Sequence, residues 1–359
     1  MNLVKELRDP ERVRVLAEKI KEIAGRDVAL MEVCGTHTVA IFRYGIRSIL
    51  PDSIKLISGP GCPVCVTSSK AVDEAVEAAQ RSNVILATFG DMIRVPGSSS
   101  SLEKAQAAGA HIQVISSPLH AVDLARECPD KEVVFFAVGF ETTSPGVAAS
   151  ILTAEKSGIK NFSILCCHKV VPPTLRFLFS GSGKVDGLIC PGHVSSIIGS
   201  KAFEFIPREL GIPAVITGFE PLDILQGVFM LLRQINQNRP EIEIQYKRGV
   251  TPEGNVHALK LLYQVFEPCS DYWRGFGVID QSGLRLRNSY RMFDARKKLH
   301  LQLPEVPEPK GCCCGEVLRG AITPRECVLY KKVCNPENPI GPCMVSSEGT
   351  CAAYFKYGW

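Results

Sequence analysis

The stretch from Ile54 to Phe89, IKLISGPGCPVCVTSSKAVDEAVEAAQRSNVILATF, shows the pattern that decides the fold. A run rich in β-branched residues at 54–57 ends at a Gly-Pro turn, and a second such run follows at 84–89. Between them, apolar side chains recur at the spacing of one helix face, at Val72, Ala75, Val76 and Ala79. A strand, a helix and a second strand in succession predict parallel βαβ units.

The same alternation continues from residue 27 to about residue 240. Its eight strand-like runs are Val28–Val33, Ile54–Ile57, Val84–Phe89, Ile112–Ile115, Val133–Val138, Phe162–Leu165, Gly187–Ile189 and Ala214–Ile216. Eight units could close a TIM barrel, but these units are short for that fold. We therefore predict an α/β fold with two doubly wound parallel-sheet (Rossmann-like) domains, at residues 27–130 and 131–240. The stretch 121–131 is the expected connection between them.

The two ends of the chain differ from this body. Residues 1–26 place apolar residues at helical spacing, with a break near Pro10, and predict N-terminal helices that pack on the body. After residue 240 the alternation stops, and residues 303–310 are rich in Pro and Glu, as a linker would be. We therefore predict a separate C-terminal domain over residues 241–359.

The C-terminal domain concentrates cysteine. Seven of the 15 cysteines follow residue 310, at Cys312, Cys313, Cys314, Cys327, Cys334, Cys343 and Cys351. Prolines interrupt this stretch, so hydrophobic packing alone is a poor means of holding it, and a metal centre would hold it. Iron–sulfur clusters and structural zinc both take four thiolates, so the spacing leaves the metal and its ligands open.

Composition and missing motifs exclude several classes of protein. A net charge of +4 gives no basic stripe, so we expect no nucleic-acid partner. No apolar run approaches the ~18 residues of a membrane helix, and no signal peptide is recognisable, so we expect no membrane association and a cytoplasmic location. Cytoplasmic thiols stay reduced, which favours metal binding or thiol chemistry over disulfides. The chain has neither a P-loop nor a CxxxCxxC motif.

Two motifs place a cysteine and a histidine directly after a predicted strand. Cys34-Gly35-Thr36-His37 follows the first run, where an open parallel sheet binds ligands and where the next helix N-terminus favours a thiolate. His37 is then a ligand, a base or a plain residue of the first helical turn. Cys190-Pro191-Gly192-His193 stands at a strand end of the second domain. If the domains face each other, His193 and Cys34 line one cleft; the alternative is a turn histidine.

A third motif, Gly59-Pro60-Gly61-Cys62-Pro63-Val64-Cys65, contains a CxxC pair at a strand-to-helix turn. Cys62 and Cys65 can form and break a disulfide there, and the helix N-terminus is expected to lower the pKa of one thiol. Half a zinc site has the same spacing, but the proline between the cysteines favours a redox pair.

Together these motifs resemble the HypD family of nickel–iron hydrogenase maturation factors. The matching segments are MEVCGTH at Met31–His37, GPGCPVC at Gly59–Cys65, CPGH at Cys190–His193 and PIGPCMVSSEG at Pro339–Gly349. The family's cluster pattern, C-x14-C-x6-C-x16-C, falls on Cys312, Cys327, Cys334 and Cys351. The resemblance thus implies a 4Fe-4S cluster on these four cysteines, with Cys313 as an extra thiol and with Cys314 and Cys343 beside the cluster.

The resemblance also implies a function. Family members are scaffolds that assemble the cyanide and carbon monoxide ligands of an iron, Fe(CN)2CO, destined for the hydrogenase large subunit. They act with a small HypC-type chaperone, which supplies another sulfur, and with a HypE-type cyanide donor. Carried over, Cys34 holds the transferable iron, and Cys62 and Cys65 relay electrons from the cluster. His37, Asp91 and His193 match further site positions. Such a protein is a redox-active assembly scaffold rather than a conventional turnover enzyme.

Two other functions remain open on the residues alone. The first is a stand-alone iron–sulfur disulfide oxidoreductase, which would use Cys62, Cys65 and the C-terminal cluster and have no need of Cys34. The second is a zinc-stapled interaction module without chemistry, which would be indifferent to loss of the CxxC pair.

Overall fold

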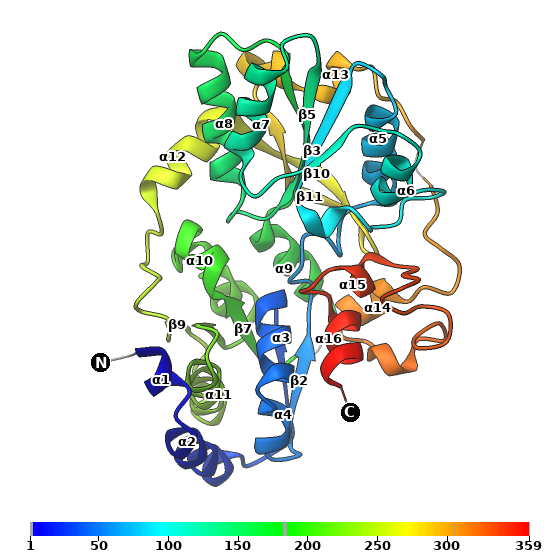
Figure 1. Ribbon diagram of the computed structural model, residues 1–359. Coiled ribbons are helices and arrows are strands. Elements are labelled where there is room, and N and C mark those ends of the chain that lie inside the picture. The colour runs from blue at the N-terminus through cyan, green and yellow to red at the C-terminus, as the bar shows by residue number, and fades with distance from the viewer. Residues whose placement is uncertain (1–2, 182–184, 305, 359) are drawn as a thin grey trace.

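The computed structural model describes residues 3–181, 185–304 and 306–358. It contains two all-parallel sheets, each covered by helices (Figure 1). A cysteine-rich C-terminal segment, residues 311–358, lies beside both sheets. The predicted α/β class with two Rossmann-like sheets is therefore confirmed. All eight predicted strands are present, with ends that differ by a few residues.

Sheet A forms the lower half of Figure 1, with strand order β2-β1-β7-β8-β9. The strands are β1 (Val28–Glu32), β2 (Ile54–Ser58), β7 (Gly187–Pro191), β8 (Ala214–Thr217) and β9 (Ile242–Ile244). Its helices are α2 (Pro10–Ile23), α3 (Gly35–Arg43), α4 (Ile46–Ile49), α10 (Gly192–Ile198) and α11 (Pro221–Asn236). Strand residues Leu30, Ile189 and Val215 pack on α2, α3, α4 and α11 in one apolar cluster.

Sheet B forms the upper half, with strand order β4-β3-β5-β6. The strands are β3 (Val84–Thr88), β4 (Ile112–Val114), β5 (Glu132–Gly139) and β6 (Phe162–His168). Its helices are α5 (Ser69–Ala79), α6 (Leu102–Ala107), α7 (Pro118–Glu127), α8 (Ser144–Lys156), α9 (Val171–Phe179) and α12 (Val256–Val265). Successive side chains of β5 point to opposite faces of the sheet and are buried in two different cores. Phe136 packs in the core that contains α5, and Phe135 packs in the core that contains α7 and α8.

The sheets do not follow the predicted division at residue 130. The chain builds β1 and β2 of sheet A, crosses to build all of sheet B, and returns for β7 to β9. Residue 130 falls inside sheet B, between β4 and β5, so the prediction of consecutive domains 27–130 and 131–240 is wrong. Periodicity shows which residues are buried but not which distant strand they meet, and β1 pairs with both β2 and β7.

The predicted C-terminal domain over 241–359 is also divided in the structure. Strand β9 extends sheet A, while α12 and the hairpin of β10 (Phe266–Trp273) and β11 (Gly277–Leu286) pack against sheet B through Leu262, Phe266 and Leu284. A short helix α13 (Ala295–Lys298) follows. The C-terminal segment then contains α14 (Cys314–Leu318), α15 (Pro342–Val345) and α16 (Thr350–Tyr357).

The N-terminal residues that the structure describes form two helices. Helix α1 (Leu3–Leu7) is followed by Asp9, whose carboxylate caps α2, and Pro10 stands in the first turn of α2. Ile20 of α2 is fully buried in the sheet A core. Among the helices of the described residues, none is both long and apolar enough to cross a lipid bilayer.

In each sheet there is one pair of neighbouring parallel strands from which the chain continues toward opposite edges of the sheet. In sheet A this switch point lies between β1 and β7, and in sheet B it lies between β3 and β5. Open α/β sheets bind ligands at the carboxyl ends of the strands at such points. The Cys34 and His193 motifs follow β1 and β7, and Asp91 follows β3, so three predicted site residues stand at switch points.

Candidate functional site

Cys34 is the residue that precedes helix α3, and its side chain is 7% exposed. Burial raises the pKa of the Cys34 thiol to about 12, and the nearby Glu348 carboxylate also raises it. The backbone N–H groups of His37 and Thr36 act in the opposite direction but do not outweigh burial. The predicted stabilisation of a thiolate by the helix N-terminus is therefore present but too weak, and Cys34 is a neutral thiol here.

The CxxC loop packs directly on the backbone of Cys34. A Cβ atom at Gly61 would lie 2.3 Å from both the Cα and the N of Cys34. The Gly35 N–H donates to the Gly61 carbonyl at 2.9 Å. This close approach requires glycine at position 61 and fixes the loop that carries Cys62 against the loop that carries Cys34.

Three residues of the C-terminal segment, Ser346-Ser347-Glu348, join the predicted site residues. Thr36 Oγ1 donates to Glu348 Oε1 at 2.6 Å, and the Cys62 thiol donates to Ser346 Oγ at 3.2 Å. Ser347 Oγ donates to Asp91 Oδ2 at 3.3 Å. The segment thus contacts the Cys34 loop, the CxxC pair and the sheet B switch point. Ser346 and Glu348 were not predicted as site residues, although they stand in the 339–349 motif, because no spacing rule links them to Cys34.

Cys62 and Cys65 are both buried, in a turn that ends before α5 begins at Ser69. The Cys65 N–H donates to Cys62 Sγ at 3.3 Å, so the pair is arranged as expected for a CxxC turn. Burial raises the pKa of Cys65, and its contacts with Cys343 and Cys62 raise it further. The expected lowering of one thiol pKa by a helix N-terminus is wrong for Cys65, because no helix begins at the pair.

Cys343 connects the CxxC pair to the C-terminal cysteines. This fully buried thiol on α15 lies close enough to the thiols of Cys314, Cys351 and Cys65 to interact with them. These three neighbouring thiols lower the pKa of Cys343. Cys314 in turn lies 3.2 Å from Cys312, sulfur to sulfur. The structure therefore contains a continuous path of thiols from Cys65 to the C-terminal segment, which the sequence did not reveal.

The four cysteines of the C-x14-C-x6-C-x16-C pattern line one small, mostly apolar pocket. Cys313, Cys314, Leu329, Tyr330 and Met344 complete much of its wall. The sulfur of Cys334 accepts a hydrogen bond from the Ile340 N–H at 3.4 Å, as a ligand thiolate would. The donor set and the apolar wall fit an iron–sulfur cluster.

Zinc and an iron–sulfur cluster place different demands on these sulfurs. Within the described residues, no three His, Cys, Asp or Glu side chains are placed to hold a single metal ion. A zinc ion needs its thiolates about 2.3 Å from one centre. A four-iron cluster binds each thiolate on a different iron and takes a wider set of ligands. Four thiolates are the donor set that both a 4Fe-4S cluster and structural zinc take.

The two predicted histidines come together on one aromatic ring. His37 and His193 both stack on Phe219, at centroid distances of 4.7 and 3.9 Å. His37 Nε2 lies 2.9 Å from the Gly218 carbonyl, so Nδ1, which has no partner among the described residues, is an available acceptor. Burial lowers the pKa of His37 to about 4, which makes it a ligand or hydrogen-bond acceptor rather than a base at neutral pH. Phe219 was not predicted.

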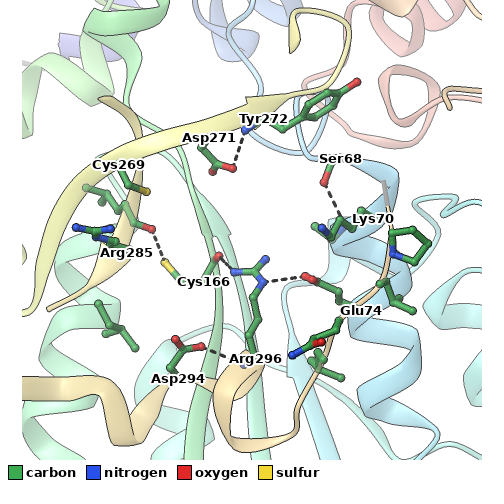
Figure 2. A pocket seen from close by; sticks show the side chains of 17 residues that line it. Ser68, Lys70, Glu74, Cys166, Cys269, Asp271, Tyr272, Arg285, Asp294 and Arg296 are labelled. Carbon is green, nitrogen blue, oxygen red and sulfur yellow. Dashed lines mark hydrogen bonds and ion pairs between the residues drawn. The ribbon is translucent and has the colours of Figure 1, made fainter. Parts of the chain in front are cut away.

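A cavity of about 670 Å³ lies elsewhere, at the edge of β6, and none of the predicted site residues lines it (Figure 2). Arg296 crosses it, with Nη1 donating to the Cys166 carbonyl at 2.8 Å and Nε pairing with Glu74 at 2.9 Å. Burial raises the pKa of Cys166 to about 12. The central cation of this cavity is thus neutralised within the protein, and burial also raises the pKa of the cavity's second thiol, Cys269.

The fold and the site define a cysteine-rich α/β protein whose thiols gather where two parallel sheets meet a C-terminal segment. The HypD family model, described as "Hydrogenase formation hypA family", matches residues 11–358. Hydrogenase maturation factors HypD from Azotobacter vinelandii and Rhodobacter capsulatus are each 47% identical to all of this chain, over 97% and 98% of their own lengths. That of Cupriavidus necator is 42% identical over 97% of its length. The chain belongs to the HypD family of hydrogenase maturation factors.

Proposed function

We propose that this chain is the scaffold on which an iron ion receives cyanide and carbon monoxide ligands before transfer to a hydrogenase large subunit. A HypC-type chaperone would contribute a second sulfur, and a HypE-type protein would deliver cyanide. The observation that carries the proposal is the convergence on Cys34 of the Gly61 loop and Glu348, which brings one buried thiol within reach of a buried thiol pair.

Cys34 would bind the iron cargo as a thiolate. Its raised pKa is no obstacle, because a bound cation makes a coordinating thiol give up its proton. Glu348, whose own pKa is raised by burial, lies beside Cys34 and is placed to take that proton. Thiolate sulfur suits a soft, low-spin iron with cyanide and carbonyl ligands.

The thiol pair would supply reducing equivalents. Cys62 and Cys65 would pass between the dithiol and the disulfide, releasing or taking up two electrons and two protons. Cys312, Cys327, Cys334 and Cys351 would hold a 4Fe-4S cluster, which when bound supplies electrons singly. Cys343, in contact with Cys65 and with Cys351, would keep the two centres in sulfur contact.

The alternative of a stand-alone disulfide oxidoreductase uses the same pair but must present it to a protein substrate. Cys62 and Cys65 are 3% and 0% exposed, and Ser346 covers Cys62. This burial favours the scaffold. A reductase would turn over a protein disulfide many times per chain with reduced ferredoxin, whereas the scaffold would not.

The test is to co-purify the Cys34→Ala variant anaerobically with the HypC-type partner and to record the infrared spectrum. We expect the bands of iron-bound cyanide and carbon monoxide to be absent from this variant and present in the wild type. Cys128→Ala is the matched control, because Cys128 is a partly buried thiol at the end of α7. Bands of full intensity in Cys34→Ala would refute the scaffold role.

The metal content of the same wild-type sample tests the cluster separately. A brown protein with about four irons in the C-terminal segment is expected. A colourless protein that contains zinc would remove the electron source and leave the zinc-stapled module as the better account.

A further inference from the structure

A second cavity, of about 290 Å³, lies between the edge of sheet A and the C-terminal segment. Edge strand β2 forms one wall, Arg47 of α4 forms another, and residues around Thr323 and Thr350 close it. Two cations and four hydroxyl groups line it, from Arg47, Lys55, Ser58, Thr323, Thr350 and Tyr354. No aspartate or glutamate is among its described lining residues.

The guanidinium group of Arg47 is held by one hydrogen bond and two aromatic rings, but not all of its N–H groups have hydrogen-bond partners among the described residues. Its Nη1 donates to the Tyr354 hydroxyl at 2.9 Å, and the guanidinium lies over the rings of Phe42 and Tyr354 at 4.4 and 5.4 Å. Its Nε and Nη2 atoms are buried and have no hydrogen-bond partner among the described residues. Buried donors of a charged group are costly to leave unpaired. Two adjacent guanidinium N–H groups have the geometry that grips two oxygens of one anion.

Within the part of the chain that the structure describes, no carboxylate forms an ion pair with Arg47. The acid that acts on it is Glu32, fully buried at the end of β1 and hydrogen-bonded to Thr38 at 2.7 Å. Burial raises the pKa of Glu32 to about 8, so this carboxyl is largely protonated at neutral pH. The cavity at β6 provides the contrast, because there Glu74 pairs directly with Arg296.

Edge strand β2 adds backbone donors. The ladder between β1 and β2 begins with the Val28 N–H on the Ser53 carbonyl and ends with the Gly59 N–H on the Glu32 carbonyl. In a parallel pair this alternation turns the N–H groups of Leu56 and Ser58 away from β1. Both residues line the cavity, so the open side of β2 faces it.

We propose that this cavity binds a small oxyanion of the phosphate or carboxylate type. Arg47, which lines the cavity, would provide the main positive charge, Lys55 would approach from the rim, and the hydroxyl groups would complete the shell. The volume suits an anion of a few heavy atoms with water rather than a nucleotide, since drug-sized ligands occupy ~300–1,000 Å³. The inference does not depend on the iron scaffold role.

The site has a structural consequence. Thr350 and Tyr354 belong to α16, the helix that also carries Cys351, while Arg47 and Lys55 belong to the body of sheet A. A bound oxyanion would therefore join the cysteine-rich segment to sheet A. Occupancy should make that segment harder to detach.

The experiment measures binding to the full chain, purified anaerobically in chloride buffer, by calorimetric titration with phosphate, sulfate, bicarbonate or acetate at constant ionic strength. We expect saturable binding of one equivalent and a rise in Tm. Binding of phosphate and sulfate would identify a phosphoryl-type ligand, and binding of bicarbonate and acetate a carboxylate-type ligand. Absence of binding by all four, or binding only at concentrations that leave an adventitious ion as the explanation, would overturn the proposal.

Variants localise the binding. Arg47→Met keeps the packing stem and should weaken binding at least tenfold, whereas Arg43→Met, an exposed arginine on the neighbouring helix α3 outside the cavity, should not change it. If Arg47→Met does not fold, Lys55→Met decides, because Lys55 is exposed and should weaken binding several-fold. Unchanged affinity in the folded Arg47 variant, or in Lys55→Met where that variant decides, would show that the anion binds elsewhere.

Discussion

Sheets A and B are built alike and differ in what stands at their switch points. Sheet A presents Cys34 and His37 there, and sheet B presents Asp91. The C-terminal segment covers the first with Glu348 and touches Asp91 of the second with the exposed Ser347. The same edge of the same kind of sheet therefore becomes a thiol site in one case only. The chemistry resides in a few side chains and in the segment that covers them, and not in the fold.

The strongest test of this comparison replaces one glycine at each sheet. Gly61→Ala would force a Cβ into the Cys34 backbone, whereas at Gly90 of sheet B a Cβ would meet only Val114 at 3.6 Å. We expect Gly61→Ala to lower the free energy of unfolding by about 3 kcal/mol, the upper part of the range for overpacking. Gly90→Ala should stay within about 0.5 kcal/mol. Denaturant unfolding at neutral pH measures both, and equal effects would contradict the asymmetry.

Each sheet has a buried histidine with a lowered pKa, so acid pH should destabilise both parts of the fold. Burial lowers the pKa of His37 in sheet A to about 4 and that of His168 in sheet B to about 3. Below the ordinary histidine pKa of ~6.5 the unfolded chain binds a proton that the folded chain does not. Each histidine therefore costs about 1.4 kcal/mol of stability per pH unit below that value, or about 2 kcal/mol at pH 5.

The buried carboxyl groups act in the opposite direction, so variants are needed to isolate the histidine effect. The pKa values of Glu32 and Glu141 are raised to about 8 and 7, which makes the fold gain stability from these groups as pH falls toward ~4.5. Between pH 7 and pH 5, the free energy of unfolding of His168→Gln should therefore fall by about 2 kcal/mol less than that of the wild type. His111→Gln, at an exposed position, should match the wild type. An unchanged pH dependence in His168→Gln would show that this histidine is protonated in the fold.

A smaller effect tests how firmly the C-terminal segment is attached to each sheet. Glu348→Ala removes the hydrogen-bond acceptor of the Thr36 hydroxyl. It should lower the stability with which the C-terminal segment is attached by about 1.5 kcal/mol, as for a hydrogen bond to a charged group. Ser347→Ala removes an exposed bond to Asp91 and should cost less than about 0.5 kcal/mol. Proteolysis rates of residues 311–358 give the comparison. A larger loss in Ser347→Ala would mean that the segment is held mainly by sheet B.

Local pattern predicted the elements of this fold but not their partners. Each of the eight strands could be found because β-branched runs and Gly-Pro turns act within a few residues. The pairing of β1 with β7 depends on contacts between residues far apart in sequence, which no local pattern encodes. The same limit applies to the site. Cys34, Cys62 and Cys65 stood out as motifs, whereas Glu348 and Phe219 gain significance only from what they touch.

The path of the chain through the two sheets has a consequence for biosynthesis. The four strands of sheet B come from one uninterrupted stretch, β3 to β6, so they can pair before β7 to β9 are made, although α12 and the β10–β11 hairpin that pack on this sheet follow later. Sheet A must wait with β1 and β2 unpaired on one side until β7 to β9 are made, and Glu348 reaches Cys34 later still. A nascent chain thus exposes its Cys34 thiol throughout most of translation, and the enclosed site exists only once nearly the whole polypeptide has been synthesised.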